Sequence, residues 1–111
     1  MTKLLHSIKN IPVYENAEDA FSLEYSVVDG SSYSGEYKSE QYGIEVSKYR
    51  EFDGILFSET KTLENITGQK RSVIRLIKLI SENSVTPFVL QEIVDEIKCD
   101  DRFNDIFELR A

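Results

Sequence analysis

The sequence has one cysteine, one histidine and no tryptophan among 111 residues. Cys99 has no partner for an internal disulfide, which is typical of a protein from a reducing cytoplasm. Cys99 and His6 are too few for a structural zinc site. A Cys–His nucleophilic pair would need both residues and a third, orienting group to meet from opposite ends of the chain. These shortages argue against metal and thiol chemistry.

Long hydrophobic runs are also missing. No apolar stretch approaches the roughly 18 residues that a membrane span needs, and the N-terminus lacks the apolar run of about 7–15 residues of a signal peptide. There is no glycine-rich phosphate loop and no nucleophile elbow. We therefore expect a cytoplasmic protein that is not an enzyme and that binds neither a cofactor nor a metal.

Basic residues are in the minority: the sequence has 13 basic and 20 acidic residues, for a net charge of −7. Such a chain is repelled by phosphate backbones and anionic membranes unless its cations cluster. Apolar residues at 41% and charged residues at 30% are ordinary for a soluble globular protein. The length predicts a single domain over residues 1–111.

The first forty residues give uneven signals. Residues 1–20 contain Pro12 and the acidic run ENAED, and we expect a short helical turn or an extended arm there. The run FSLEYSVVDG alternates apolar and polar residues, which predicts a strand. Residues 31–41 have no aliphatic side chain, so they are expected to form a mobile loop. Tyr33 and Tyr37 could contact a partner from this loop, or could simply be solvated.

A β-hairpin is predicted around Asp53-Gly54, a pair typical of a type I′ turn. The turn sets a register in which Lys48 faces Glu59, and we expect a cross-strand ion pair there. This register also places apolar residues together on one face, which supports it independently of the turn. That face holds Ile44, Val46, Phe52, Ile55, Phe57 and Leu63.

Two helices are predicted, over residues 69–82 and 87–98. Thr86 is a candidate N-cap for the second, Pro87 fits its first position, and Val85 with Leu90 matches a hydrophobic staple. The apolar stripes recur at helical spacing. They consist of Val73, Leu76, Ile77 and Ile80, widened by Ile74 and Leu79, in the first helix and Leu90, Ile93, Val94 and Ile97 in the second. We therefore predict an α+β fold: a three-stranded antiparallel β-meander packed against a C-terminal helical hairpin with a short terminal helix.

The stretch SENSVTPFVLQEIVDEI has the outline of a DNA-reading helix-turn-helix. A recognition helix needs exposed Arg, Lys, Asn or Gln, yet after Gln91 this helix exposes only Glu92, Asp95 and Glu96. The pattern therefore favours a packing role. The first helix carries a basic stripe, and an anionic partner could bind it, although a solvated helix face explains it as well. This stripe consists of Arg71, Arg75 and Lys78.

Phe88 projects away from the predicted core stripe and needs cover. The C-terminal tail, with Phe103, Ile106, Phe107 and Leu109, could supply it, or a second chain could.

The segments YGIEVSKY and NSVTPFVLQEIVDEI resemble a family of short uncharacterised proteins of spore-forming bacteria, over about residues 42–98. The resemblance implies a bacterial cytoplasmic setting and no known activity. The leading hypothesis is a small non-catalytic interaction or regulatory protein that binds another protein or itself, through Phe88, the tail and the tyrosine-bearing loop. The alternative is nucleic-acid-linked regulation, either by direct binding of the basic stripe or by an acidic surface that mimics nucleic acid.

Overall fold

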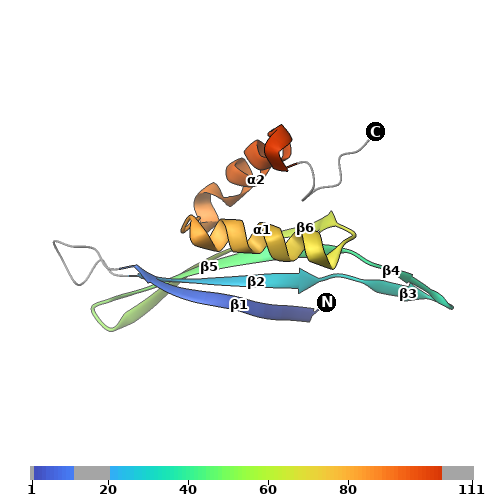
Figure 1. Ribbon diagram of the computed structural model, residues 1–111. Helices are drawn as coiled ribbons and strands as arrows, with labels where there is room; N and C mark the ends of the chain where they lie inside the picture. Colours follow the sequence, from blue (N-terminus) through green and yellow to red (C-terminus); the bar gives the residue numbers. More distant parts are fainter. Residues whose placement is uncertain (1, 12–20, 104–111) are drawn as a thin grey trace.

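A computed structural model describes residues 2–11 and 21–103 and shows an α+β fold (Figure 1). Four strands form one antiparallel sheet in the order β1-β2-β5-β6. Their bounds are β1 Thr2–Ile11, β2 Phe21–Asp29, β5 Tyr42–Phe52 and β6 Ile55–Thr67. The three predicted strands are therefore present, but the sheet has a fourth.

The additional strand comes from the segment expected to be an N-terminal arm. β1 pairs with β2 along its whole length, with a register shift between Leu5 and Ser7. This irregularity breaks the alternation that identifies a strand in a sequence. Leu4, Leu5 and Ile8 stay about half exposed, so burial gives little signal either. Residues 12–20 of the predicted arm lie outside the described residues.

The segment 31–41, expected to be a mobile loop, contains a second, two-stranded sheet. β3 (Ser32–Ser34) pairs with β4 (Tyr37–Ser39), and Gly35 has a φ of 63° in the turn between them. At the base, the Gly30 N–H donates to the Gln41 carbonyl at 2.8 Å. Backbone pairing and a glycine turn thus organise this segment, although its side chains are exposed.

The β5–β6 hairpin follows its predicted register from Phe52–Ile55 to Ile44–Leu63. Asp53 and Gly54 have φ values of 51° and 75°, as a type I′ turn requires. The expected Lys48–Glu59 ion pair, however, is not formed. The Lys48 ammonium instead lies 4.4 Å from the ring centroid of Phe21 on the neighbouring strand.

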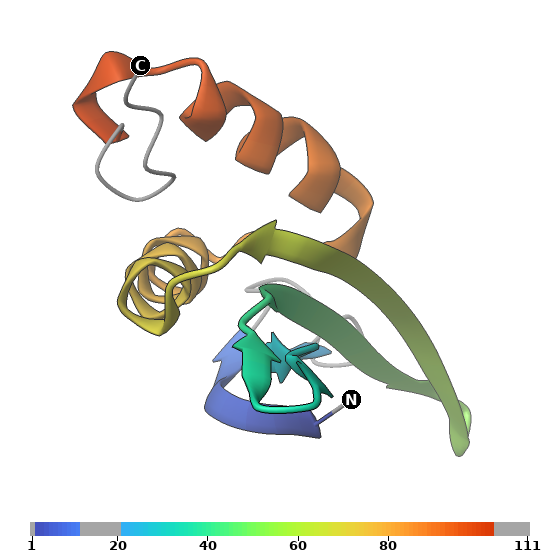
Figure 2. The ribbon, with the colours of Figure 1, turned by 90° about the vertical axis from the view of Figure 1, so that its right-hand side faces the viewer.

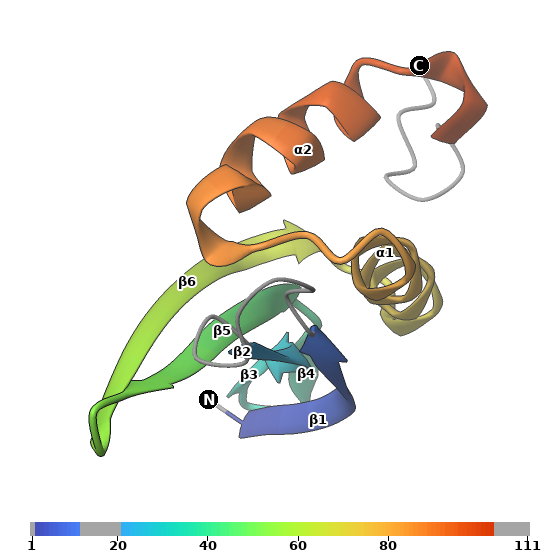
Figure 3. The ribbon, with the colours of Figure 1, turned by 90° about the vertical axis from the view of Figure 1, so that its left-hand side faces the viewer.

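The helices follow the sheet in the chain. α1 (Lys70–Glu82) lies lengthwise over one side of the sheet, whereas α2 (Leu90–Lys98) stands beside β6 (Figures 2 and 3). A 3₁₀ turn, η2 (Pro87–Val89), precedes α2, and another, η3 (Asp101–Phe103), follows it. Thr86 occupies the predicted cap position, but its side chain makes no capping hydrogen bond.

The core lies between the α1 side of the sheet and the helices. Tyr25 is fully buried in it, and its hydroxyl donates to the Val85 carbonyl at 3.0 Å. Burial raises the pKa of Tyr25 to about 12. Ile74, predicted to widen the apolar face of α1, is instead 43% exposed. The predicted stripes supply most of the remaining core, which includes Leu23, Val27, Ile44, Val46, Val73, Leu76, Ile77, Ile80, Leu90 and Val94.

Candidate protein-binding surfaces

The apolar face of the β5–β6 hairpin is only half covered. Ile44 and Val46 are fully buried, but Phe52, Ile55 and Phe57 are exposed by 47%, 58% and 47%. Lengths explain the difference, since α1 with 13 residues spans about 20 Å, whereas 11 residues of β5 span about 37 Å. The sheet therefore continues beyond the helices as an uncovered surface.

We call this surface the distal face. Its members share one side of the sheet, because Phe21 is the register partner of Arg50, and Arg50 is the partner of Phe57. Side chains two residues apart on a strand point to the same side. The distal face consists of Phe21, Lys48, Arg50, Phe52, Ile55 and Phe57.

Cations lie among the rings of the distal face. The Arg50 guanidinium lies 5.8 Å from the Phe57 ring centroid, an arrangement like that of Lys48 and Phe21. Lys61 adds a third positive charge on the same side of the sheet, where Glu59 is the only carboxylate that the described strands β5 and β6 contribute. The distal face is therefore cationic in a chain whose net charge is −7.

Phe88 lies in η2, the turn that leads from the linker into α2. It is 89% exposed, and its element η2 contacts both β5 and β6. Glu92 and Asp95 follow Phe88 in the chain, and because they are three residues apart they share one side of α2. Both are exposed, and the Gln91 side chain donates to Asp95 at 3.0 Å. An aromatic ring and an acidic flank thus adjoin the cationic surface.

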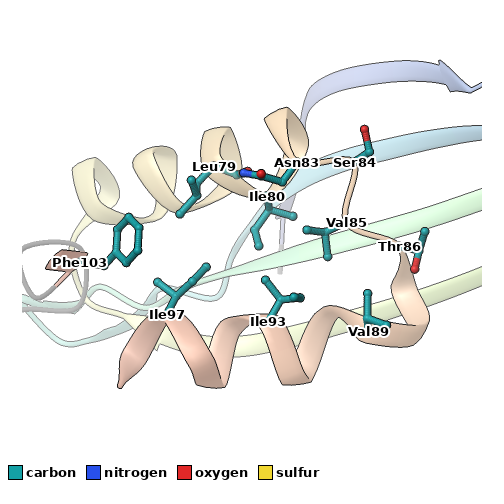
Figure 4. A pocket seen from close by; sticks show the side chains of 10 residues that line it. All are labelled: Leu79, Ile80, Asn83, Ser84, Val85, Thr86, Val89, Ile93, Ile97 and Phe103. Atoms are coloured by element: carbon teal, nitrogen blue, oxygen red, sulfur yellow. The ribbon is translucent and has the colours of Figure 1, made fainter. Parts of the chain in front are cut away.

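A groove of about 490 Å³ separates α2 from α1 (Figure 4). The close-up shows Phe103 at the end near Ile97, with Val89 and Thr86 at the other end. The two helices are thus not closely packed along their length, as the predicted helical hairpin would be. The groove is lined by Leu79, Ile80, Asn83, Ser84, Val85, Thr86, Val89, Ile93, Ile97 and Phe103.

The linker at the groove forms a Schellman motif. The Ser84 N–H donates to the Ser81 carbonyl, and the Val85 N–H to the Ile80 carbonyl. Ser84 holds the left-handed position, with a φ of 51°, where glycine is usual. The motif turns the chain from α1 towards α2 and places Val85 in the core.

The opposite side of the sheet carries a polar cluster, although Leu5, Ile8 and Leu56 are exposed there as well. The Glu45 carboxylate accepts the Lys3 ammonium at 2.9 Å and the Thr62 hydroxyl at 2.8 Å, so it links β1, β5 and β6. Burial opposes its ionisation, but the hydrogen bonds from Lys3 and Thr62 outweigh burial and lower the pKa of Glu45. This carboxylate has a structural role.

The other predicted site residues are dispersed. Tyr33 and Tyr37, 74% and 82% exposed, lie on the β3–β4 ribbon, at the end of the molecule opposite the Asp53-Gly54 turn (Figure 1). Phe103 lies at the groove, at the other end of α2 from Phe88. The structure therefore does not join the tyrosines, Phe88 and Phe103 in one surface. Phe107 lies outside the described residues.

The basic stripe of α1 forms a further separate surface. Arg71, Arg75 and Lys78 lie on the exposed side of the helix, together with Ile74. This side faces away from the sheet, because the buried residues of α1 are those of the opposite stripe.

Neither a metal centre nor a membrane span is found in the part of the chain that the structure describes. No three His, Cys, Asp or Glu side chains there are grouped so that they could hold a metal ion. No helix there is both long enough and apolar enough to cross a membrane. Cys99 is exposed at the end of α2.

The protein is a small α+β domain with a curved antiparallel sheet. Helices cover part of one side of this sheet, and the rest of that side is the exposed apolar distal face. The chain belongs to a family of unknown function, DUF6514, whose model matches residues 6–100. The match includes most of β1 and so extends beyond the resembling segments. No curated protein and no solved structure matches the chain.

Proposed function

We propose that this is a small non-catalytic interaction or regulatory protein of the bacterial cytoplasm, and that it binds a protein partner through the distal face and Phe88. One observation carries the proposal: apolar side chains that belong to the buried side of the sheet stay uncovered where the helices end. Contiguous exposed apolar surface with a polar rim is typical of protein-binding sites.

The composition of the surface supports this proposal. Phenylalanine and arginine are both enriched in protein interfaces, and the distal face combines three Phe rings with Arg50. A hydrophobic centre with a charged rim lets a partner bury the rings while the cations stay near water. The lone cysteine supports the cytoplasmic setting.

The test is affinity capture from the native host with the wild type and two variants, read by mass spectrometry. One variant is Phe88→Asp, and the other combines Ile55→Thr with Phe57→Thr, which keeps strand-forming side chains. Removal of a central anchor costs about 2 kcal/mol or more, so we expect about 30-fold weaker binding of the captured protein.

Ile74→Thr is the matched control, because it removes a large apolar side chain that is also about half exposed, but from the outer side of α1. All variants should keep the circular dichroism of the wild type. Undiminished capture by both surface variants would show that this surface is wrongly assigned.

A further inference from the structure

Two adjoining surfaces of this chain have opposite charge. The distal face displays Lys48 and Arg50 around its rings, and the exposed side of α2 displays Glu92 and Asp95 behind Phe88. Each surface also has uncovered apolar side chains. A partner that fits the distal face should therefore have an aromatic anchor with carboxylates beside it.

We propose that this partner is a second copy of the chain, and that two copies form a closed dimer about a two-fold axis. Phe88 of each copy packs against the distal face of the other, and Glu92 and Asp95 approach Lys48 and Arg50 across the interface. The inference deepens the proposed function, on which it rests, by naming the occupant of the same surface.

The position of η2 favours a closed dimer over an open chain of copies. In a two-fold interface each surface contacts its counterpart on the other copy, so the two complementary surfaces have to lie side by side. The element that bears Phe88 meets this requirement, because η2 contacts both β5 and β6, the strands that bear most of the distal face. Surfaces on opposite ends of the molecule would produce filaments instead.

Charge favours the arrangement in which Phe88 of one copy contacts the distal face of the other over the arrangement in which the two distal faces contact each other. If two distal faces met directly, Lys48 and Arg50 of one copy would oppose the same cations of the other, and like charges at an interface are costly. The exchanged arrangement places each cation near a carboxylate. Complementary potentials fix the pairing and accelerate association more than they add affinity.

The exposed apolar area is sufficient for the centre of a dimer interface. Phe88, Phe52, Phe57 and Ile55 together expose on the order of 500 Å², since a large side chain offers about 150–250 Å². A stable interface buries about 800 Å² per subunit, of which the rest is polar rim. The flanking charged side chains supply this rim.

Two charge-reversal variants, measured alone and as a mixture, test the inference. One variant carries Lys48→Glu and Arg50→Glu, and the other carries Glu92→Lys and Asp95→Lys. In each variant alone, like charges meet across the two-fold axis. In a mixture, the acidic distal face of one variant meets the basic α2 of the other, while the two unchanged surfaces also remain complementary.

Molar masses are measured by light scattering after size exclusion, at about 100 µM, where an interface with a Kd of about 1 µM is largely formed. We expect a dimeric wild type, at least tenfold weaker dimerisation of each variant alone, and a heterodimer in the equimolar mixture. High salt should weaken the wild-type dimer and the heterodimer alike.

Two results would overturn the inference: a monomeric wild type, or a wild-type dimer with a mixture that stays monomeric. The Glu92→Lys, Asp95→Lys variant changes only exposed positions of α2, so it keeps the test valid if the strand variant fails to fold. A monomeric wild type that still captures a partner through Phe88 would remove the dimer and leave the proposed function standing.

Discussion

At the scale of single residues, the hydroxyl of Tyr25 makes the most consequential polar contact. It crosses the core from β2 to the linker between the helices, where it donates to the Val85 carbonyl. Val85 is itself held by the Schellman motif that ends α1. The contact therefore joins the sheet to the point where the chain turns towards Phe88.

Tyr25→Phe should lower the free energy of unfolding by about 1–3 kcal/mol, because the buried carbonyl of Val85 loses its donor. Urea denaturation followed by circular dichroism measures the change. Tyr33→Phe is the control, since its ring lies on the exposed ribbon. Equal stability of the two variants would mean that the hydrogen bond contributes nothing.

The same residue predicts a pH dependence. The pKa of Tyr25 is about 12 in the folded protein against 10.0 unperturbed, so the unfolded chain loses this proton first as pH rises. The contribution of the protonated Tyr25 hydroxyl to the free energy of unfolding is complete below pH 10 and is lost between about pH 10 and 12. Between pH 9 and pH 11, the free energy of unfolding measured by urea denaturation should fall less for Tyr25→Phe than for the wild type.

At the scale of elements, the β5–β6 hairpin shows what local chemistry determines. The Asp53-Gly54 turn fixes the register, and Gly43 permits the irregularity at the other end, between Tyr42 and Ile44. A Cβ at Gly43 would overlap the Leu63 carbonyl oxygen and approach the Glu64 Cα. The two strands can meet this closely only because residue 43 has no side chain.

Gly43→Ala should destabilise the protein by about 3 kcal/mol, because the obstructing atoms are backbone and cannot rotate away. Gly30→Ala is the matched control, since its Cβ would lie 3.5 Å from the nearest atom, an ordinary contact. Thermal unfolding compares the two. If Gly43→Ala and Gly30→Ala have the same melting temperature, the strands do not approach each other as closely as described.

The elements also show which features a sequence reveals. The hairpin and the stripes of both helices are predictable because turn chemistry and periodicity act over a few residues. β1 is not, because adjacent Leu4 and Leu5 and the irregularity before Ser7 disrupt its alternation. The β3–β4 ribbon escapes detection because backbone bonds and Gly35, rather than aliphatic burial, hold it.

The candidate site is harder to predict than the fold. Alternation places Phe52, Ile55 and Phe57 on the apolar side of the hairpin, as the register confirms. It says nothing about whether another element covers them, because cover depends on the length and placement of α1. The sequence does contain one signal for the missing cover: the predicted first helix is shorter, in ångströms, than the predicted hairpin strands.

At the scale of the whole molecule, the distribution of charge separates the protein-binding proposal from the nucleic-acid alternative. The exposed side of α2 is acidic, and the net charge is −7. The basic side of α1, with Arg71 and Lys78, is the surface on which direct binding would depend. Phosphate contacts there would have to overcome the repulsion of the remaining molecule.

We expect no gel shift of duplex DNA or RNA at low salt. A shift that decreases with added salt would instead support direct binding, and Arg71→Ala with Lys78→Ala should then weaken it. An acidic mimic would cause no shift alone, but it would inhibit the shift caused by its partner. Glu92→Lys with Asp95→Lys should then abolish this inhibition.

The register shift in β1 has a consequence for how the protein behaves in a crowded solution. β1 is an outer strand of the sheet, and its Leu4, Leu5 and Ile8 are exposed, so a regular strand here would be a template for amyloid-like stacking. The irregularity at Leu5 and Ser7 interrupts the even row of backbone donors and acceptors that a stray strand would need. The same irregularity that hides β1 in the sequence thus helps to keep the folded chain from polymerising.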